Sequence, residues 1–130
     1  MSADASINFH IVMDENGVPE KVVWNNSDQS GTVSSDCKAI QIRIWEGIES
    51  NMANFDIWTK DMNVHEMNAF YYKSFIMMAQ GFKNATGNAQ VADSIMQFAA
   101  AFAETLQIKI DGDDDSDGPI PFQMNIPSEL

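Results

Sequence analysis

Basic side chains are scarce in this sequence. Seven lysines and arginines stand against 19 aspartates and glutamates, so the 130-residue chain carries a formal net charge of −12. Such a surface would repel the phosphate backbone of a nucleic acid, and no cluster of basic residues offsets the repulsion. An anionic membrane surface is disfavoured for the same reason. We therefore expect no nucleic acid among the partners of this protein.

Cysteine and long apolar runs are lacking as well. Cys37 is the only cysteine, which excludes an intramolecular disulfide and fits a redox-neutral compartment. No apolar run approaches the ~18 residues that cross a bilayer, so we expect no direct membrane insertion. The N-terminal stretch has neither the basic region nor the long apolar region of a signal peptide. Together these absences predict a cytoplasmic protein.

Catalytic and cofactor motifs are also missing. There is no glycine-rich phosphate loop and no nucleophile elbow. His10 and His65 have no partner motif, and "HEMNA" after His65 lacks the second histidine of a zinc-binding H-E-x-x-H. A helix N-terminus would lower the pKa of Cys37, but its place on an apolar stripe favours a buried small side chain. We predict no catalytic residue, no cofactor, no metal ligand and a non-enzymatic function.

What is present is the composition of a globular domain with an acidic end. Apolar residues make up 45% of the chain, enough for one hydrophobic core at this length. Residues 111–130 hold six acidic side chains, several prolines and no base. We therefore divide the chain into a single α+β domain, residues 1–110, and an acidic, proline-containing C-terminal tail, residues 111–130.

Alternation of apolar and polar residues marks the strands. Residues 7–14, "INFHIVMD", alternate with period two, and residues 21–26, "KVVWNN", are rich in β-formers. The intervening "ENGVPE" carries an Asn-Gly turn signal, so the two runs predict an antiparallel hairpin. The polar residues 27–36 predict a loop. Residues 54–60, "NFDIWTK", predict a third strand.

Residues 36–52 fit two patterns. "IQIRI" alternates as a strand does, whereas Cys37, Ile40, Ile44 and Ile48 fall on one face of a helix. Ser35 and Asp36 are suitable helix caps, and the stretch is longer than an ordinary strand. We predict a helix here.

Two further helices are predicted more simply. The first runs from Val64 to about Ala85, after an Asn63…Glu66 pair that resembles a capping box, and ends at Gly87. The second spans about 89–106, with a wide apolar face formed by Val91, Ile95, Phe98, Phe102 and Leu106 and by Ala92, Met96, Ala99 and Ala103 beside them.

The helix 64–85 is apolar nearly all round, which predicts burial on more than one side. A homodimer through this helix would cover what the sheet and the last helix leave exposed. The expected fold is α+β: a small antiparallel sheet of about three strands, a β-hairpin plus one strand, packed against about three helices.

The stretch "FDIWTKDMNVHEM", residues 55–67, gathers aromatic, acidic and basic side chains. It is either a site or the joint between a strand and a helix, and we interpret it as the joint. Trp58 and Lys60 should then face away from Phe55 and Ile57. Because aromatic residues dominate binding hot spots, we take Trp58, Lys60 and Asp61 as the candidate interaction surface.

The acidic run "DGDDDSDG", residues 111–118, matches the first positions of an EF-hand loop. The match then fails, because Met124 stands where the loop needs glutamate and Pro119 and Pro121 oppose the following helix. A solvated tail is the simpler interpretation. The apolar residues Ile120, Phe122, Met124 and Ile126 alternate beyond it and could dock along an edge strand.

Three segments carry a resemblance to a known family. "VPEKVVWN" (18–25), "DIWTKDMNVHEM" (56–67) and "FKNATG" (82–87) resemble the gliding motility-associated protein GldC family of the Bacteroidetes. The resemblance covers about residues 7–110. It implies a small accessory protein of an envelope machinery tied to protein secretion, and it brings no catalytic residue. The acidic tail departs from the family pattern, and Asn63 replaces a proline often found there.

Two functional hypotheses follow. The first is a non-enzymatic accessory protein that acts through contacts with protein partners of the gliding and secretion machinery. The alternative is a small-ligand or calcium-responsive binding module that uses a pocket between the sheet and the helices, the acidic tail, or both.

Overall fold

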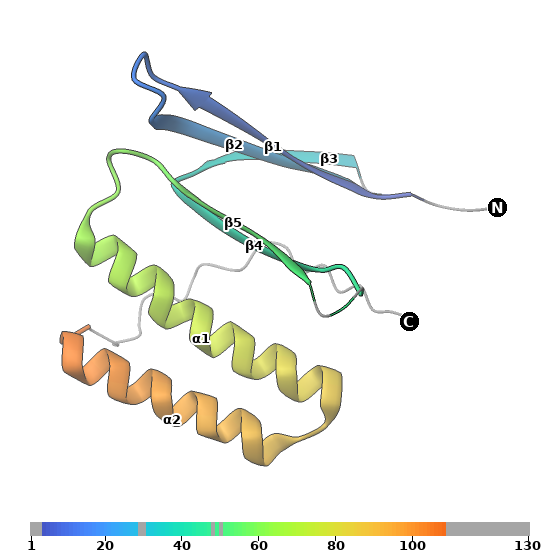
Figure 1. The fold of residues 1–130 in the computed structure, drawn as a ribbon, viewed down its shortest axis with the longest axis vertical. Coiled ribbons are helices and arrows are strands. Elements are labelled where there is room, and N and C mark those ends of the chain that lie inside the picture. The colour runs from blue at the N-terminus through green and yellow to red at the C-terminus, as the bar shows by residue number, and fades with distance from the viewer. Residues whose placement is uncertain (1–3, 29–30, 48, 50, 109–130) are drawn as a thin grey trace. The chain divides into compact units, whose positions relative to one another are not determined.

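Figure 1 shows the fold in a computed structural model, which describes residues 4–28, 31–47, 49 and 51–108. Five strands are followed by two helices: β1 (Ser6–Met13), β2 (Pro19–Asp28), β3 (Gly31–Cys37), β4 (Ala39–Trp45), β5 (Met52–Trp58), α1 (Val64–Thr86) and α2 (Ala89–Leu106). The strands belong to one compact unit, which ends at Val64, and the helices to a second, which begins at His65. The predicted α+β class is confirmed.

The first sheet is an antiparallel meander in the order β1-β2-β3. The predicted hairpin is confirmed, with Phe9 opposite Trp24 and Ile11 opposite Val22. Its turn uses Gly17 at a φ of +75°, a conformation that glycine adopts without steric cost. Val22, on the middle strand β2, is fully buried.

The prediction of a loop at residues 27–36 is wrong. β2 continues to Asp28, and β3 then pairs with it from Gly31 to Cys37. Serine, threonine and glycine here signalled a loop. Pairing with a long neighbouring strand overrides that preference. The backbone N–H and C=O groups of β3 then find hydrogen-bonding partners on β2.

The prediction of a helix over 36–52 is also wrong. β4 and β5 form a second, two-stranded antiparallel sheet. Ile42 explains the error. Ile40 and Ile44 share a face in a helix and in a strand alike, but Ile42 joins them only in a strand. In the structure it does so, opposite Phe55. The described residues therefore contain two helices and five strands, where about three of each were expected.

The two helices match their predicted ranges closely. Gly87 follows α1 with a φ of +75°, and its N–H donates to the carbonyl of Lys83 at 2.8 Å. Asn88 caps α2 by accepting a hydrogen bond from the backbone N–H of Val91 at 3.0 Å. Both features are as expected from the sequence. The capping box of Asn63 and Glu66 stays a prediction.

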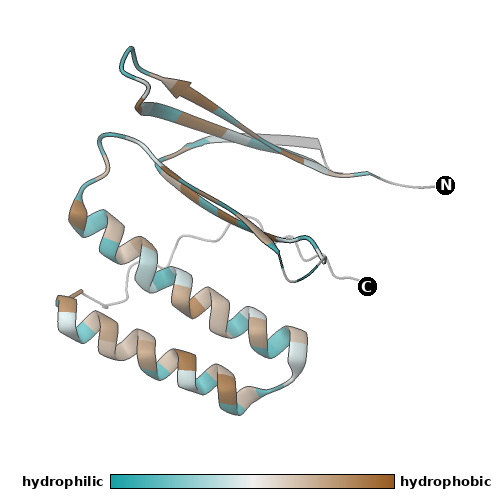
Figure 2. Ribbon diagram, viewed as in Figure 1, coloured by the Kyte–Doolittle hydropathy of each residue, from teal (hydrophilic) through white to brown (hydrophobic). Residues whose placement is uncertain are grey.

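Alanines, rather than the large apolar residues, form the buried seam of the helical unit. Ala79 of α1 and Ala92, Ala99 and Ala103 of α2 are almost completely buried. Small side chains let two helix backbones approach closely. The large side chains therefore lie beside this seam, and Figure 2 shows apolar residues on most turns of both helices.

Candidate functional site

The joint between β5 and α1 is held to the strands by its backbone. Thr59 is buried, and its N–H donates to the carbonyl of Lys38 at 2.8 Å. The next N–H, that of Lys60, donates to the carbonyl of Pro19 at 2.9 Å. These bonds fix the end of β5 against the start of β2 and the β3–β4 connection. The interpretation of this stretch as a joint is consistent with the geometry.

Lys60 forms an ion pair across the joint. Its Nζ lies 2.9 Å from Oδ2 of Asp14, while Oδ1 of Asp14 accepts from the backbone N–H groups of Asn16 and Val18. The hydrogen bond from Lys60, followed by those from the turn, lowers the pKa of Asp14 to about 2, and the same pair raises the pKa of Lys60. Lys60 therefore ties the first hairpin turn to the end of β5.

Asp61 also has partners inside the same unit. The Thr59 hydroxyl donates to Oδ1 of Asp61 at 2.6 Å, and this bond lowers the pKa of the Asp61 carboxyl. The Nζ of Lys38 lies 3.9 Å from its Oδ2. That ion pair is long and exposed, so it contributes little to stability. Lys60 and Asp61 thus have structural contacts, which leaves Trp58 as the candidate anchor.

Trp58 lies on one of the two faces of the β4–β5 hairpin, and we call this face the tryptophan face. The register places eight residues on it: Ala39, Gln41, Arg43 and Trp45 of β4 and Met52, Asn54, Asp56 and Trp58 of β5. The exposed fractions are 45% for Trp58 and 63% for Trp45. The sequence alone does not single out Trp45, because it predicts a helix over residues 36–52.

An ion pair occupies the centre of the tryptophan face. Nη1 of Arg43 lies 3.1 Å from Oδ1 of Asp56, and Asn54 donates to the other carboxylate oxygen at 3.4 Å. Trp45 and Trp58 are six residue pairs apart in the register, which corresponds to about 20 Å along the strands. The face thus has a large aromatic side chain near each end and a polar middle.

The opposite face of the hairpin carries Ile40, Ile42, Ile44, Ala53, Phe55 and Ile57. Its cross-strand pairs are entirely apolar, and Ile44 and Phe55 are 45% and 49% exposed, as much as Trp58. The predicted separation of Phe55 and Ile57 from Trp58 is confirmed by the register. Both faces of the hairpin therefore expose large side chains, and the tryptophan face differs from the other by its polar centre.

The remaining sequence candidates, Cys37, His10 and His65, lie on three different elements, β3, β1 and α1. Cys37 ends β3 instead of starting a helix, and desolvation, followed by the charge of Asp36, raises the pKa of its thiol. A hollow of about 240 Å³ lies beside it, lined by Glu20, Lys21, Asp36, Lys38, Thr59 and Asp61. The helix dipole expected to activate this thiol is absent, because the predicted helix is a strand. His10 is exposed on β1.

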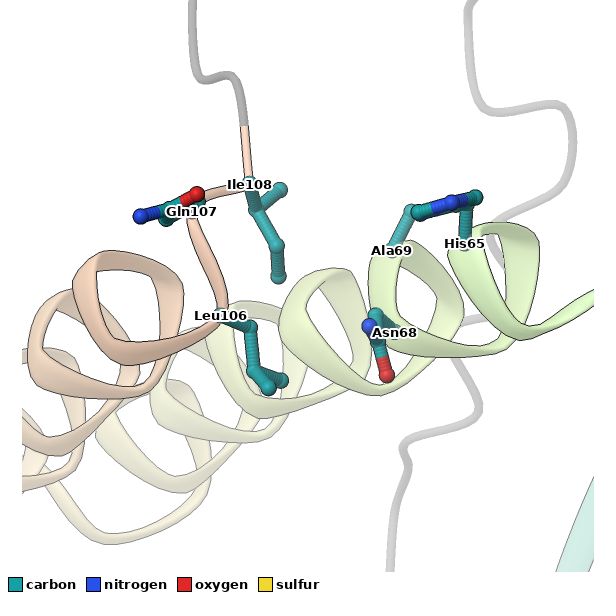
Figure 3. Close-up of a pocket in the computed structure, with 6 residues that line it drawn as sticks. All are labelled: His65, Asn68, Ala69, Leu106, Gln107 and Ile108. Atoms are coloured by element: carbon teal, nitrogen blue, oxygen red, sulfur yellow. The ribbon is translucent and has the colours of Figure 1, made fainter.

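His65 lines a different hollow, of about 370 Å³, at the open end of the helical hairpin. Figure 3 shows the start of α1, with His65, Asn68 and Ala69, next to Leu106, Gln107 and Ile108 at the end of α2. Gln107 adopts a left-handed conformation, and the N–H of Ile108 donates to the carbonyl of Ala103 at 2.9 Å. This C-cap turns the chain back over the hollow.

The described residues contain neither a metal-binding cluster nor a membrane-spanning helix. Within the part of the chain that the structure describes, no three His, Cys, Asp or Glu side chains are grouped to hold a metal ion. The EF-hand-like run 111–118 and the apolar positions 120–126 lie outside the described residues. Among the described helices, none is both long and apolar enough to cross a membrane.

Comparison with known proteins supports the resemblance stated from the sequence. A family model described as gliding motility-associated protein GldC-like matches residues 19–108. Comparisons with curated proteins and with solved structures gave no significant match. The family match runs from the start of β2 to the residue after the α2 cap, which is more than half of the chain. The chain therefore belongs to the GldC-like family of gliding motility-associated proteins.

Proposed function

We propose that this protein is a non-enzymatic accessory component of the gliding and secretion machinery, and that it works by binding a protein partner on the tryptophan face. Family membership supports the link to gliding motility. The mode of action rests on the geometry of β4 and β5.

One observation carries the proposal: two tryptophans on the same strand face are about half exposed or more. Tryptophan is large and is highly buried on average. Two of them beside the Arg43–Asp56 pair give apolar anchors around a polar centre, which is the composition of a binding hot spot. A partner with two apolar side chains about 20 Å apart, for instance an extended segment of about seven residues, would match their spacing.

The non-enzymatic part of the proposal is supported by the state of the titratable groups. The Cys37 thiol has a raised pKa and is therefore a poor nucleophile at neutral pH. Asp56 is paired with Arg43, and Asp61 is hydrogen bonded to Thr59. These groups have structural partners in place of catalytic ones.

The test is affinity capture from the native cell with the full chain as bait. The bait is wild type, Trp58→Ala, or the double variant Trp45→Ala/Trp58→Ala. Met13→Ala serves as a matched control, because Met13 is a large exposed apolar residue on β1, away from the tryptophan face.

We expect components of the gliding machinery with wild type and with the Met13 variant, and their loss with the double tryptophan variant. Equal recovery with all baits would show that the tryptophan face is not the binding surface. Recovery of no gliding component with wild type would remove the proposed mode of action altogether.

A further inference from the structure

Nine apolar side chains make a second surface, on the helical unit, which we call the aromatic face. On each helix they are spaced three or four residues apart, which keeps them on one side. They are Tyr71, Phe75, Met78 and Phe82 of α1 and Val91, Ile95, Phe98, Phe102 and Leu106 of α2.

Ring contacts join the two rows into one surface. The ring of Phe75 lies 5.1 Å from that of Phe98 and 5.1 Å from that of Phe102, both edge-on. Phe98 and Phe102 are 6.1 Å apart, and Tyr71 is 6.4 Å from Phe75. These are ordinary distances for favourable aromatic pairs. The face therefore continues from α1 to α2 without a break.

The aromatic face lies beside the alanine seam. Four of its nine side chains are half-buried, those of Tyr71, Phe75, Ile95 and Phe102, and the other five are more exposed. Met78 and Phe98 are each 54% exposed, and Phe82, Val91 and Leu106 are between 36% and 41% exposed. A hollow of about 300 Å³ lies along α2, lined by Phe98, Ala101, Phe102, Thr105 and Leu106. A row of large apolar side chains with this exposure usually marks a binding surface.

The charge of the helical unit indicates which kind of partner covers the aromatic face. None of the nine residues is charged, and residues 65–108 hold three acidic and two basic side chains, one negative charge in excess, against −12 for the chain. A basic partner would be selected by an acidic rim, and the described residues 65–108 supply only that one excess negative charge. Two copies of the same acidic protein, in contrast, repel each other least where they are nearly neutral.

We propose that the aromatic face is covered by the aromatic face of a second copy of this chain, as a two-fold symmetric dimer. Such an interface is self-complementary, since each apolar row meets the same row of its partner. The exposed part of the nine side chains amounts to roughly 600 Å² per copy, if a large apolar side chain presents about 200 Å². Stable dimers bury about 800 Å² per copy, so this dimer is of modest affinity.

This dimer does not depend on the tryptophan face, which lies on the other unit. Sedimentation velocity of the full chain between about 1 and 200 µM separates the two. We expect wild type to shift from monomer to dimer over this range, as micromolar affinity requires. Phe98→Glu should stay monomeric, a loss of at least tenfold in affinity, because it places a charge in the centre of the apolar contact.

Two controls keep the outcome clear. Met77→Glu alters an equally exposed residue of α1 that lies outside the aromatic face, and it should dimerise as wild type does. Val91→Glu changes the far end of the face and should also be monomeric, so the result does not rest on one variant. Circular dichroism checks that each variant remains helical.

Wild type that stays monomeric up to 200 µM would overturn the dimer. So would dimers that form equally well in wild type, Phe98→Glu and Met77→Glu, because the contact would then lie elsewhere. Capture of the gliding partner is a separate readout, and the double tryptophan variant should lose that capture while it remains dimeric.

Discussion

The tryptophan face of the strand unit and the aromatic face of the helical unit expose similar kinds of side chain in different settings. On β4 and β5, two tryptophans flank the Arg43–Asp56 ion pair, which lies at 3.1 Å. On α1 and α2, nine apolar side chains follow one another with no charge among them. A polar centre requires a partner with matching polar groups, so it favours specificity. An apolar surface with no charge in it can pack against any similar apolar surface. The aromatic face of a second copy is such a surface.

The difference predicts that each face can be removed without harm to the other. It also predicts that neither face is the main source of stability in its unit. In the helical unit that role belongs to the alanine seam, and in the strand unit the buried Val22 and the bonds at the joint contribute.

The largest expected effect concerns the alanine seam. Ala99→Leu should destabilise the helical unit by about 1–3 kcal/mol, because a buried alanine between two helices leaves no room for three more carbons. Ala101→Leu, at an exposed position of the same helix, is the matched control and should change stability by less than about 0.5 kcal/mol. Urea unfolding followed by helical circular dichroism measures both.

A tolerated Ala99→Leu would contradict the assignment of the seam. The aromatic face would then have to be the true packing face of the helices, and the proposed dimer would lose its basis. This experiment therefore tests whether α2 packs on α1 through its alanines, and whether its larger apolar side chains are left for another contact.

Loss of partner binding should be of similar size. The double variant Trp45→Ala/Trp58→Ala should weaken partner affinity by about 2 kcal/mol or more, as expected for hot-spot tryptophans. Titration of the captured gliding component measures the affinity, and urea unfolding of the same variant gives its stability. A large loss of stability would mean instead that the tryptophans belong to the core.

A smaller effect should arise at the Asp14–Lys60 pair, and it should depend on pH. The folded-state pKa of Asp14, about 2, lies below its ordinary value of 3.8. Its ionised form is therefore favoured by folding, and the contribution to stability is present above about pH 4 and lost as the pH falls toward 2. Asp14→Asn removes the charge but keeps an acceptor for the turn.

The unfolding midpoints of wild type and Asp14→Asn should differ modestly at pH 6 and converge between pH 4 and pH 2. The tryptophan face should keep its partner in both proteins at neutral pH. A difference that stays constant down to pH 2 would show that the ionised carboxylate is not what stabilises the turn.

The smallest effect is expected at Cys37. Cys37→Ser should capture the gliding partner as wild type does, since the thiol has a raised pKa and lies outside both faces. The capture experiment measures this directly. Loss of biological activity with partner binding intact would instead point to chemistry at this thiol and would argue against a non-enzymatic function.

Local signals were sufficient for the helices and for the first hairpin. Gly87 and Asn88 end one helix and begin the next through backbone bonds that their own residue types favour. Period-two alternation marked β1, and the Asn-Gly pair marked its turn. In these places, the information that determines the structure lies within a few residues.

The signals failed where pairing decides the structure. β3 is polar and became a strand through its register with β2, and the faces of β4 depend on its register with β5. Trp45 was missed for this reason, whereas Trp58 was found on a strand that alternates clearly. Which side chains of α2 are buried also depends on where α1 packs against it. The sequence of α2 alone does not show that its alanines are buried more deeply than its larger side chains.

The most direct test of the account measures both faces in both variants. Phe98→Glu and Trp45→Ala/Trp58→Ala would each be examined for dimerisation by sedimentation velocity and for affinity toward the captured gliding component. We expect a monomer that binds the partner in the first case and a dimer that does not bind it in the second. Loss of both properties in either folded variant would contradict this expectation, because the two faces would then not act separately.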